Sequence, residues 1–238
     1  MEETRRDKRR AFKQFVKQNA ADLPITQDGE LRKVSFEKDG KFDYGLYKEV
    51  QTRGNKYKLD WQWVPEGHIK LLSDHMLSLG LTPRTGICHG TRQGFEQTWF
   101  RDHLPGDADV IGTEISDTAD QFPHTIQWDF HEVKPEWLGQ TDFIYSNSWD
   151  HSYDPKKAFV AWTSCLSPGG VMMLDHAQDF MPDQISTLDP CGISEEGLVD
   201  LLNTEHNDIG EVVAVLEGGK RKRERIRTIV FQKRPEPS

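Results

Sequence analysis

The sequence has few cysteines and no long apolar run. Its three cysteines, Cys88, Cys165 and Cys191, are an odd number, lie far apart and form no CxxC pair, so they do not predict a disulfide framework. No segment approaches the roughly 20 apolar residues that a membrane-spanning helix needs. No apolar stretch follows the charged N-terminus, as it would in a secretory signal. We therefore expect a cytoplasmic protein without a membrane partner.

Basic residues are outnumbered by acidic residues. The chain has 30 Lys and Arg residues against 39 Asp and Glu residues, a net charge of −9. Phosphate binding relies on clustered cations, so this balance disfavours nucleic acid as a partner. Two local basic patches, in residues 1–21 and 220–227, could still attract an anionic molecule. The sequence leaves the oligomeric state open.

A length of 238 residues suits one full domain with an added segment. The first part of the chain differs in pattern from the rest, and we predict an N-terminal extension over residues 1–81 and a main domain over residues 82–238. The elements predicted in the extension are a basic helix over 2–21, a β-rich segment over 31–64 with a hairpin turn at Asp39-Gly40, and a helix over 66–79.

After Gly80, short apolar strands alternate with helical stretches, which predicts an α/β fold with a mainly parallel sheet and helices on both faces. The last two of seven predicted strands are joined by Gly218-Gly219 and a basic cluster. This connection has no room for a crossover helix, so the two strands must pair as an antiparallel hairpin. The predicted strands are 85–89, 109–115, 125–130, 142–148, 171–176, 211–217 and 226–232, and the predicted helices are 94–103, 155–166 and 194–205.

The first two predicted strands end in residues suited to a nucleotide, at the edge where open parallel sheets bind ligands. The first strand runs into a turn with Gly90 and Gly94, which lets backbone N–H groups approach a ligand closely. The second strand ends at Glu114, a carboxylate able to accept both hydroxyls of a ribose. The same glycines could merely form a tight turn, and a lone Glu could be a solvated loop residue.

The next two strand ends add aromatic and small polar side chains. Asp129 and Phe130 could receive the amine of an adenine and cover its ring, although core packing explains Phe130 equally well. A run of donors and acceptors over 146–153 follows the fourth strand, and Asp154-Pro155 begins a helix. So many polar groups are poor core material, and they indicate a site in this connection.

In this order, the features resemble a class I S-adenosylmethionine-dependent methyltransferase over about residues 82–232. They are the glycine turn GICHGTRQG, the acids in IGTEIS and WDF, and the stretch DFIYSNSWDHSYDPKKAFVAWTSCLSPGGVMML. The resemblance implies a Rossmann-like sheet, S-adenosyl-L-methionine as the cofactor, and methyl transfer to a small-molecule, sugar-like or natural-product acceptor. One departure is that Gly86 stands where the family has an acid, while Cys88 and Arg92 occupy two glycine positions.

The resemblance also assigns roles by position. It implies that the cofactor is bound by His89, Gly90, Thr91 and Arg92 at its methionine part, by Glu114 and Ile115 at the ribose, by Asp129 and Phe130 at the adenine, and by Ser146, Asn147 and Ser148 near the methyl group. The acceptor would contact Trp149 and Tyr153. His176, at the end of the fifth strand, could also enter the acceptor pocket, or it could instead cap an element or lie at the edge of the core.

A general base is optional for this reaction, because the sulfonium leaving group is already activated and alignment alone supplies about 7–11 kcal/mol. An acceptor hydroxyl would need one, and His151, oriented by Asp150, is the candidate catalytic pair. The same two residues could instead simply begin a helix. His131, His176 and Asp129 show no short metal-ligand spacing with His151, so the sequence predicts no metal site.

Two other functions remain open. A nicotinamide-dependent oxidoreductase would also use an acid after the second strand, but the chain has no GxGxxG motif. A non-catalytic binding protein that keeps the methyltransferase fold would account for the incomplete glycine triplet.

Overall fold

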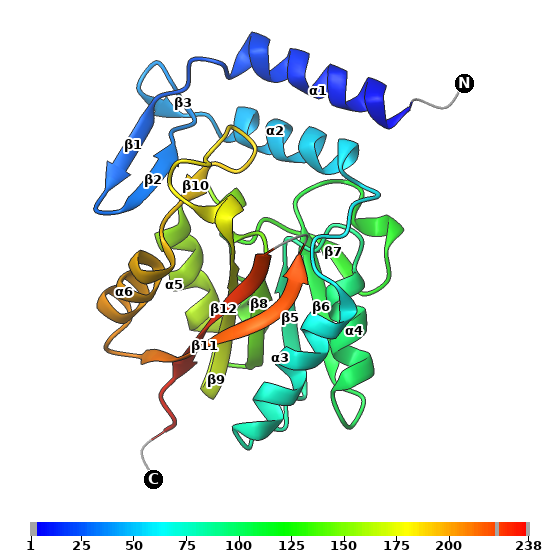
Figure 1. The fold of residues 1–238 in the computed structure, drawn as a ribbon, viewed down its shortest axis with the longest axis vertical. Helices are drawn as coiled ribbons and strands as arrows, with labels where there is room; N and C mark the ends of the chain where they lie inside the picture. The colour runs from blue at the N-terminus through cyan, green and yellow to red at the C-terminus, as the bar shows by residue number, and fades with distance from the viewer. Residues whose placement is uncertain (1–3, 222–223, 237–238) are drawn as a thin grey trace.

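The computed structural model describes residues 4–221 and 224–236, and a seven-stranded sheet forms its centre (Figure 1). The strands are β5 (Thr85–His89), β6 (Asp109–Glu114), β7 (Thr125–Gln127), β8 (Thr141–Ser146), β9 (Leu166–His176), β11 (Gly210–Arg221) and β12 (Glu224–Lys233). Their order is β11-β12-β9-β8-β5-β6-β7. The strands β5 to β9 run parallel, and β12 pairs antiparallel with both β9 and β11. The predicted fold class and the antiparallel last strand are confirmed.

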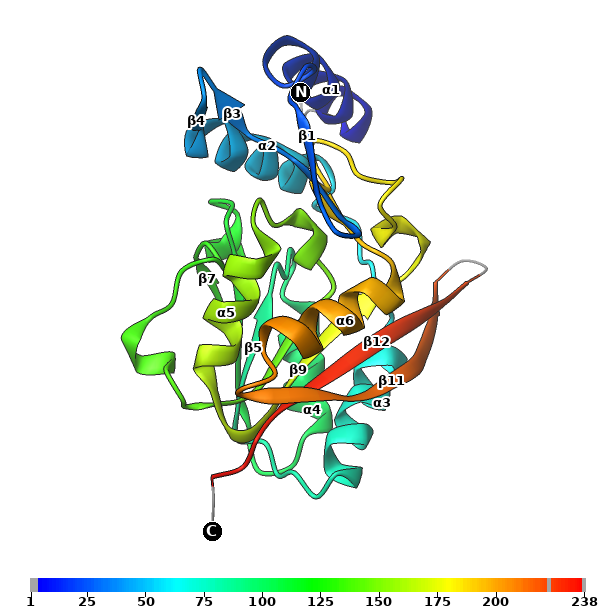
Figure 2. The same cartoon turned by 90° about the vertical axis from the view of Figure 1, so that its left-hand side faces the viewer.

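Helices cover both faces of this sheet, so the inner strands bury side chains on both sides. In β8, Ile144 packs in the same apolar cluster as α5 (Pro155–Cys165) and α6 (Glu195–Glu205). Its neighbours Phe143 and Tyr145 face the opposite cluster, which includes α3 (Glu66–Ser78) and α4 (Phe95–His103). Figure 2 shows α5 and α6 together on one side of the sheet. The continuous apolar runs that predicted the strands reflect this two-sided burial.

Two helix starts follow directly from the sequence. Asp154 caps α5 by accepting a hydrogen bond from the backbone N–H of Lys157 at 3.2 Å, and Pro155 takes the first helical position. Ser194 caps α6 in the same way, by accepting from the N–H of Gly197 at 2.9 Å. The cap at Asp154 fixes where the polar connection after β8 ends.

An N-terminal layer lies across the end of the sheet where the parallel strands finish (Figures 1 and 2). Its elements are α1 (Arg5–Asn19), β1 (Ile25–Asp28), β2 (Leu31–Val34), β3 (Glu37–Lys38), β4 (Lys41–Phe42) and α2 (Tyr44–Tyr57). The strand β2 also pairs with β10 (Cys191–Gly192), which belongs to the segment after β9. Helix α3 packs on the central sheet, although it precedes residue 82. The division of the chain at residue 81 stays a prediction.

The expectation of a β-rich segment over residues 31–64 is wrong for its second half, which forms helix α2. Alternating aromatic residues around Tyr44 suggested a strand, but Asp43 caps a helix by accepting from the N–H of Leu46 at 2.9 Å. The buried face of this helix includes Gln51 and Asn55. Polar side chains on the buried face interrupt the apolar periodicity of this helix, which explains why we did not predict it from the sequence.

The predicted turn at Asp39-Gly40 is present between β3 and β4. Both residues have positive φ, +52° and +72°, as a two-residue hairpin turn of the primed type requires. A longer hairpin precedes it, in which β1 and β2 are joined at Gly29 with φ +60°. We did not predict this second hairpin, although Asp28-Gly29 carries the same turn signal.

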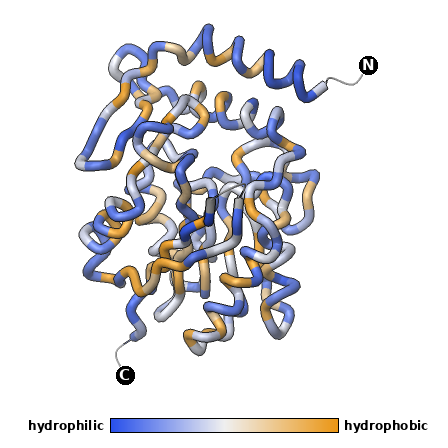
Figure 3. Tube along the Cα trace, viewed as in Figure 1, coloured by the Kyte–Doolittle hydropathy of each residue, from blue (hydrophilic) through white to orange (hydrophobic). Residues whose placement is uncertain are grey.

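The two basic patches are surface features. Figure 3 shows α1 as mostly hydrophilic, and Phe12 is its buried residue. At the β11–β12 hairpin, Arg227 pairs with Glu195 at 2.9 Å and Glu217 at 3.4 Å, while Lys222 and Arg223 lie outside the described residues.

All three cysteines are buried free thiols. The sequence had predicted no disulfide framework. Among the described residues, none of the helices combines the length and the apolar character needed to cross a membrane.

A buried polar network at the end of β9 generates a stability prediction. Asp175 is fully buried and accepts hydrogen bonds from Tyr145 at 2.5 Å and Thr228 at 2.7 Å, and it contacts His68 Nε2 at 2.9 Å. Asp175→Ala would leave these partners buried without an acceptor, so we expect a loss of about 3 kcal/mol or more in the free energy of unfolding. Urea denaturation followed by tryptophan fluorescence measures this loss.

Asp74→Ala is the matched control, because its carboxylate is 59% exposed and pairs with Lys70 one turn earlier. That change should cost no more than about 0.5 kcal/mol. Equal effects of the two variants would show that the Asp175 network does not stabilise the fold.

Candidate functional site

Two adjoining cavities lie between the N-terminal layer and the carboxyl ends of the parallel strands. The first encloses about 500 Å³ of empty space and the second about 1030 Å³, both including their openings to solvent. The residues that line both cavities are Lys58, Gly90, Arg92, Ser148 and His151. These shared residues make the two cavities parts of one site.

Helix α2 supplies one wall of the first cavity. Tyr47, Gln51, Asn55 and Lys58 follow each other at spacings of three and four residues, so they lie on one side of the helix and its C-terminal end. Tyr47 Oη donates to the carbonyl of His151 at 3.1 Å, and Gln51 donates to the carbonyl of Leu188 at 2.9 Å. We did not predict these site residues from the sequence, although polar residues at helical spacing could have indicated them.

Glu114 stands at the end of β6 and faces the first cavity, together with Ile115. It is 6% exposed and accepts a hydrogen bond from the backbone N–H of Ser116 at 3.0 Å. Burial raises the pKa of this carboxyl, while the Ser116 N–H and the Arg92 guanidinium oppose the rise. The carboxylate therefore lies where the sequence placed a ribose ligand.

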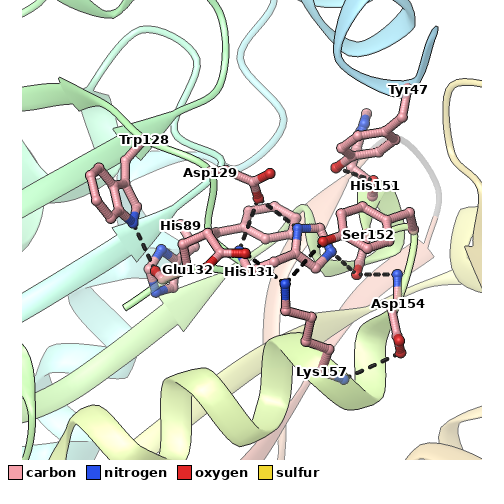
Figure 4. Close-up of polar contacts among 12 residues, drawn as sticks. Tyr47, His89, Trp128, Asp129, His131, Glu132, His151, Ser152, Asp154 and Lys157 are labelled. Atoms are coloured by element: carbon pink, nitrogen blue, oxygen red, sulfur yellow. Dashed lines mark hydrogen bonds and ion pairs between the residues drawn. The ribbon is translucent and has the colours of Figure 1, made fainter. Parts of the chain in front are cut away.

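Asp129 and Phe130 line the same cavity, in the loop that follows β7 rather than in the strand itself. Asp129 Oδ1 accepts hydrogen bonds from the backbone N–H of His131 at 3.0 Å and contacts His131 Nδ1 at 2.6 Å (Figure 4). Burial opposes ionisation of Asp129, but the hydrogen bonds from His131 outweigh it, so its pKa lies below 3.8. His131 thus holds Asp129 as an oriented anion.

The orientation of His131 is fixed in turn by two neighbours. Its Nε2 lies 2.6 Å from Ser152 Oγ, and its ring stacks on Tyr153 with centroids 3.8 Å apart. Figure 4 shows this chain of contacts from Asp129 to Ser152. Tyr153, which we expected to contact an acceptor, therefore supports the wall of the first cavity from behind.

Gly90 brings the backbone close to both cavities. Its φ is +74°, and an added Cβ would lie 2.7 Å from Ser148 Cβ, so only glycine fits this position. A close contact also explains Gly86, which stands where the methyltransferase family has an acid. A Cβ on Gly86 would lie 2.3 Å from the ring of Phe143, so the strand has no space for a larger residue.

Arg92, like Lys58, is a cationic residue that lines both cavities. Its Nη1 donates to the carbonyl of Trp61 at 2.6 Å, and its buried Nε has no hydrogen-bond partner within residues 4–221 and 224–236. Burial lowers the pKa of the guanidinium, and the nearby Glu114 and Glu96 oppose this shift. An unpartnered N–H group beside two cavities is suited to an anionic group of a ligand.

Glu96, in the first turn of α4, is a further site residue that we did not predict. It is 5% exposed, lines the second cavity, and accepts hydrogen bonds from Gln62 at 2.8 Å and Asn147 at 3.1 Å. Thr91 Oγ1 lies 2.8 Å from its other carboxylate oxygen. Glu96 therefore orients Asn147 at the cavity wall, while Thr91 lies behind that wall.

The predicted catalytic pair has different partners from those expected. His151 Nδ1 lies 2.8 Å from Gln51 Oε1 and its Nε2 lies 3.3 Å from Asp189 Oδ1, so Gln51 and Asp189, rather than Asp150, orient the ring. Burial lowers the pKa of His151 to about 4, although Asp189 opposes the shift. Burial raises the pKa of Asp150, and the charge of Asp189 adds to that rise.

Four other predicted site residues are placed in the core. Trp149 is fully buried and donates to the carbonyl of Asp175 at 2.7 Å, and His176 stacks against Trp149 and contacts the carbonyl of Ile193. His89 stacks on Trp162, and Ser146 Oγ donates to the carbonyl of His89 at 3.1 Å. These four side chains pack in the core and are not among the residues that line the two cavities, so the structure gives them packing roles, and the ligand contacts expected for them stay predictions.

Structural comparison finds methyltransferases of similar fold. The 1,6-didemethyltoxoflavin-N1-methyltransferase of Burkholderia thailandensis, solved with its substrate and S-adenosylhomocysteine, has a TM-score of 0.61 and 11% identity, covering 88% of this chain and 99% of that chain. The N-methyltransferase NodS of Bradyrhizobium japonicum WM9, solved with S-adenosylhomocysteine, has a TM-score of 0.55 and 14% identity, covering 77% and 98% of the two chains. A SAM dependent methyltransferase of Aquifex aeolicus has a TM-score of 0.52 and 14% identity, covering 81% and 100%. No protein-family model and no curated protein sequence matches this chain.

The buried His89 behind the first cavity generates a pH prediction. Burial lowers its pKa from 6.5 to about 3, so between these values the unfolded chain binds a proton that the folded chain does not. The stability that His89 contributes is complete above pH 6.5 and is lost as the pH falls toward 3. At pH 5 this loss amounts to about 2 kcal/mol.

Urea denaturation at pH 8 and pH 5 tests this expectation. The difference in unfolding free energy between the two pH values should be about 2 kcal/mol smaller in His89→Gln than in the wild type, whatever the variant costs at pH 8. An unchanged difference would mean that His89 titrates alike in the folded and unfolded chains.

Proposed function

Because this chain has the fold of class I S-adenosylmethionine-dependent methyltransferases, we propose that it transfers a methyl group from S-adenosylmethionine to a small-molecule acceptor. The single observation that carries the proposal is that Glu114, Asp129 and Phe130, from two different strand ends, line one cavity. Two carboxylates and an aromatic ring around one cavity match the hydroxyl, amine and ring face of an adenosine.

The residues that surround the cavities fit the remaining part of the cofactor as well. Gly90 and Ser148 lie where the two cavities meet, so they would flank the sulfonium end. Arg92 has an unpartnered Nε at the same junction and would hold the carboxylate of the methionine part. Arg92 occupies a position where the methyltransferase family has a glycine. This role would account for that difference, because an arginine supplies a cation that a glycine could not.

When bound, S-adenosylmethionine supplies a methyl group on a sulfonium, a leaving group that needs no further activation. The chain's task is therefore alignment and exclusion of water. Asn147 and Ser148 lie on the wall of the second cavity next to Gly90, so they would position the atom that attacks the methyl group. Asn147 donates a hydrogen bond from its amide to Glu96, which fixes the orientation of that amide before an acceptor binds.

The second cavity is the place for the acceptor. Trp61, Trp63 and Phe180 supply aromatic surface, and acidic and amide side chains supply hydrogen-bonding groups. This mixture fits a small polar molecule with a flat or apolar part. The methyltransferase of Burkholderia thailandensis found by structural comparison was solved with bound 1,6-didemethyltoxoflavin and S-adenosylhomocysteine.

A nicotinamide-dependent oxidoreductase is less well supported. The antiparallel β12 inside the sheet and the methyltransferases found by structural comparison favour the methyl-transfer reaction. A binding protein without catalytic activity would keep the first cavity but show no turnover with any acceptor.

The decisive prediction concerns Glu114. Glu114→Ala should weaken binding of S-adenosylhomocysteine by about 1.5–3 kcal/mol, the usual contribution of a hydrogen bond to a charged group, which is roughly 10- to 150-fold in Kd. Isothermal titration calorimetry measures the two affinities. Glu114→Gln, which keeps the size of the side chain and one acceptor, should lie between the alanine variant and the wild type.

Glu211→Ala serves as the control, since Glu211 is an exposed acid at the start of β11. It should bind S-adenosylhomocysteine as the wild type does. Absence of saturable binding to the wild type would overturn the proposed function, and equal affinities of wild type and Glu114→Ala would remove Glu114 from the ribose site.

A further inference from the structure

Three side chains at the boundary of the two cavities form a cluster with metal-ligand chemistry. They are Asp150 and His151, which follow β8, and Asp189, from the segment after β9. One nitrogen or oxygen atom from each lies within 4.8 Å of the others. From the sequence we paired Asp150 with His151 but missed the cluster, because Asp189 lies 38 residues further along the chain.

The imidazole of His151 is oriented like that of a metal ligand. Gln51 Nε2 donates to the carbonyl of Leu188, which leaves Gln51 Oε1 facing His151 Nδ1 at 2.8 Å as a hydrogen-bond acceptor. The Nδ1 atom therefore carries a proton, and Nε2 points to Asp189 Oδ1 at 3.3 Å. A carbonyl or amide oxygen on one ring nitrogen is the usual support of a histidine that binds a metal through the other.

Asp150 provides an independent observation. The residue is 6% exposed, and its Oδ1 has no hydrogen-bond partner among the residues that the structure describes. A buried carboxylate oxygen without a partner is costly, since such groups are nearly always paired or bound to a cation. The carboxylate lines the second cavity beside His151, so a ligand there would satisfy it.

The charges around the cluster also leave room for a cation. Lys58 Nζ lies 3.6 Å from Asp189 Oδ1 and compensates one of the two carboxylates in part. Asp179 acts on Asp150 with a further negative charge, while Lys58 acts on Asp150 and Arg92 on Asp189 with positive charges. Three carboxylates thus face two cations, and Asp150 Oδ1 is the carboxylate oxygen without a hydrogen bond among the described residues.

We propose that Asp150, His151 and Asp189 bind one first-row divalent transition-metal ion. Bonds of about 2.0–2.2 Å place two ligands of one ion roughly 3–3.5 Å apart, which the pair of His151 Nε2 and Asp189 Oδ1 already satisfies. An oxygen of the Asp150 carboxylate lies within 4.8 Å of a ligand atom of each of the other two residues. One imidazole with two carboxylates suits zinc, manganese, iron or cobalt better than calcium or magnesium.

The position of the cluster gives the ion a role. His151 lines both cavities, so the ion stands between the place for the cofactor and the place for the acceptor. There it would bind an oxygen of the acceptor and lower its pKa, which replaces the general base that we first assigned to His151. This role rests on the proposed function, whereas binding of the ion does not.

Metal titration of the untagged, full-length chain tests the proposal in the absence of S-adenosylmethionine. After treatment with EDTA and buffer exchange, Co²⁺ is added and followed by visible absorbance, and Zn²⁺ and Mn²⁺ are added in a calorimeter. We expect saturable binding of one ion per chain to the wild type. Asp150→Asn and His151→Gln should each weaken that binding at least tenfold, because each removes one of three ligands.

Asp74→Asn is the matched control, because it also removes one carboxylate charge, but from an exposed residue of α3 outside the cluster, and it should bind the ion as the wild type does. The thermal unfolding midpoint gives a second readout, since an ion that binds only the folded chain raises it. We expect the rise in the wild type and in Asp74→Asn but not in Asp150→Asn. If Asp150→Asn does not fold in EDTA, Asp189→Asn, whose side chain is 32% exposed, takes its place.

Absence of saturable binding to the wild type would overturn the proposal. Equal binding by the wild type and the Asp150 and His151 variants would also overturn it, because the ion would then lie elsewhere. Titration of S-adenosylhomocysteine in EDTA is measured in parallel, so that loss of the metal site and loss of the cofactor site are distinguished.

Discussion

Helix α2 covers the open ends of the parallel strands, and this one contact determines what the molecule can enclose. A parallel sheet leaves its loops at a common edge, and without a cover that edge is a shallow surface. Tyr47 and Gln51 attach the helix to the loops after β8 and β9 through hydrogen bonds to carbonyl groups. The cavities, the burial of Glu114 and the orientation of His151 all follow from that attachment.

The central sheet could be predicted from the sequence because its information is local. Each inner strand is a short apolar run, and the residue at which each run ends is polar, as at Glu114 in β6. Connection lengths then decide which strands are parallel, and they force β11 and β12 into a hairpin. For the same reason the strand ends bring Glu114, Asp129 and Phe130 to the first cavity, and the ligand contacts expected for them stay predictions.

The cover of the site could not be predicted in this way. Helix α2 buries Gln51 and Asn55 beside its apolar residues, which interrupts its apolar stripe with polar positions. Its partners Leu188 and Asp189 belong to a segment near the other end of the chain. Side-chain direction beyond a strand end is also not encoded locally. Trp149 and Asp150 are adjacent, yet one fills the core and the other lines a cavity.

The pairing of β2 with β10 ties the cover to a part of the chain that the ribosome makes late. During synthesis, β2 can pair with β1 at once, but its second partner is absent until Cys191 and Gly192 have left the exit tunnel. The segment that supplies Leu188 and Asp189 to α2 is made only shortly before. The pocket therefore closes only when most of the polypeptide is available.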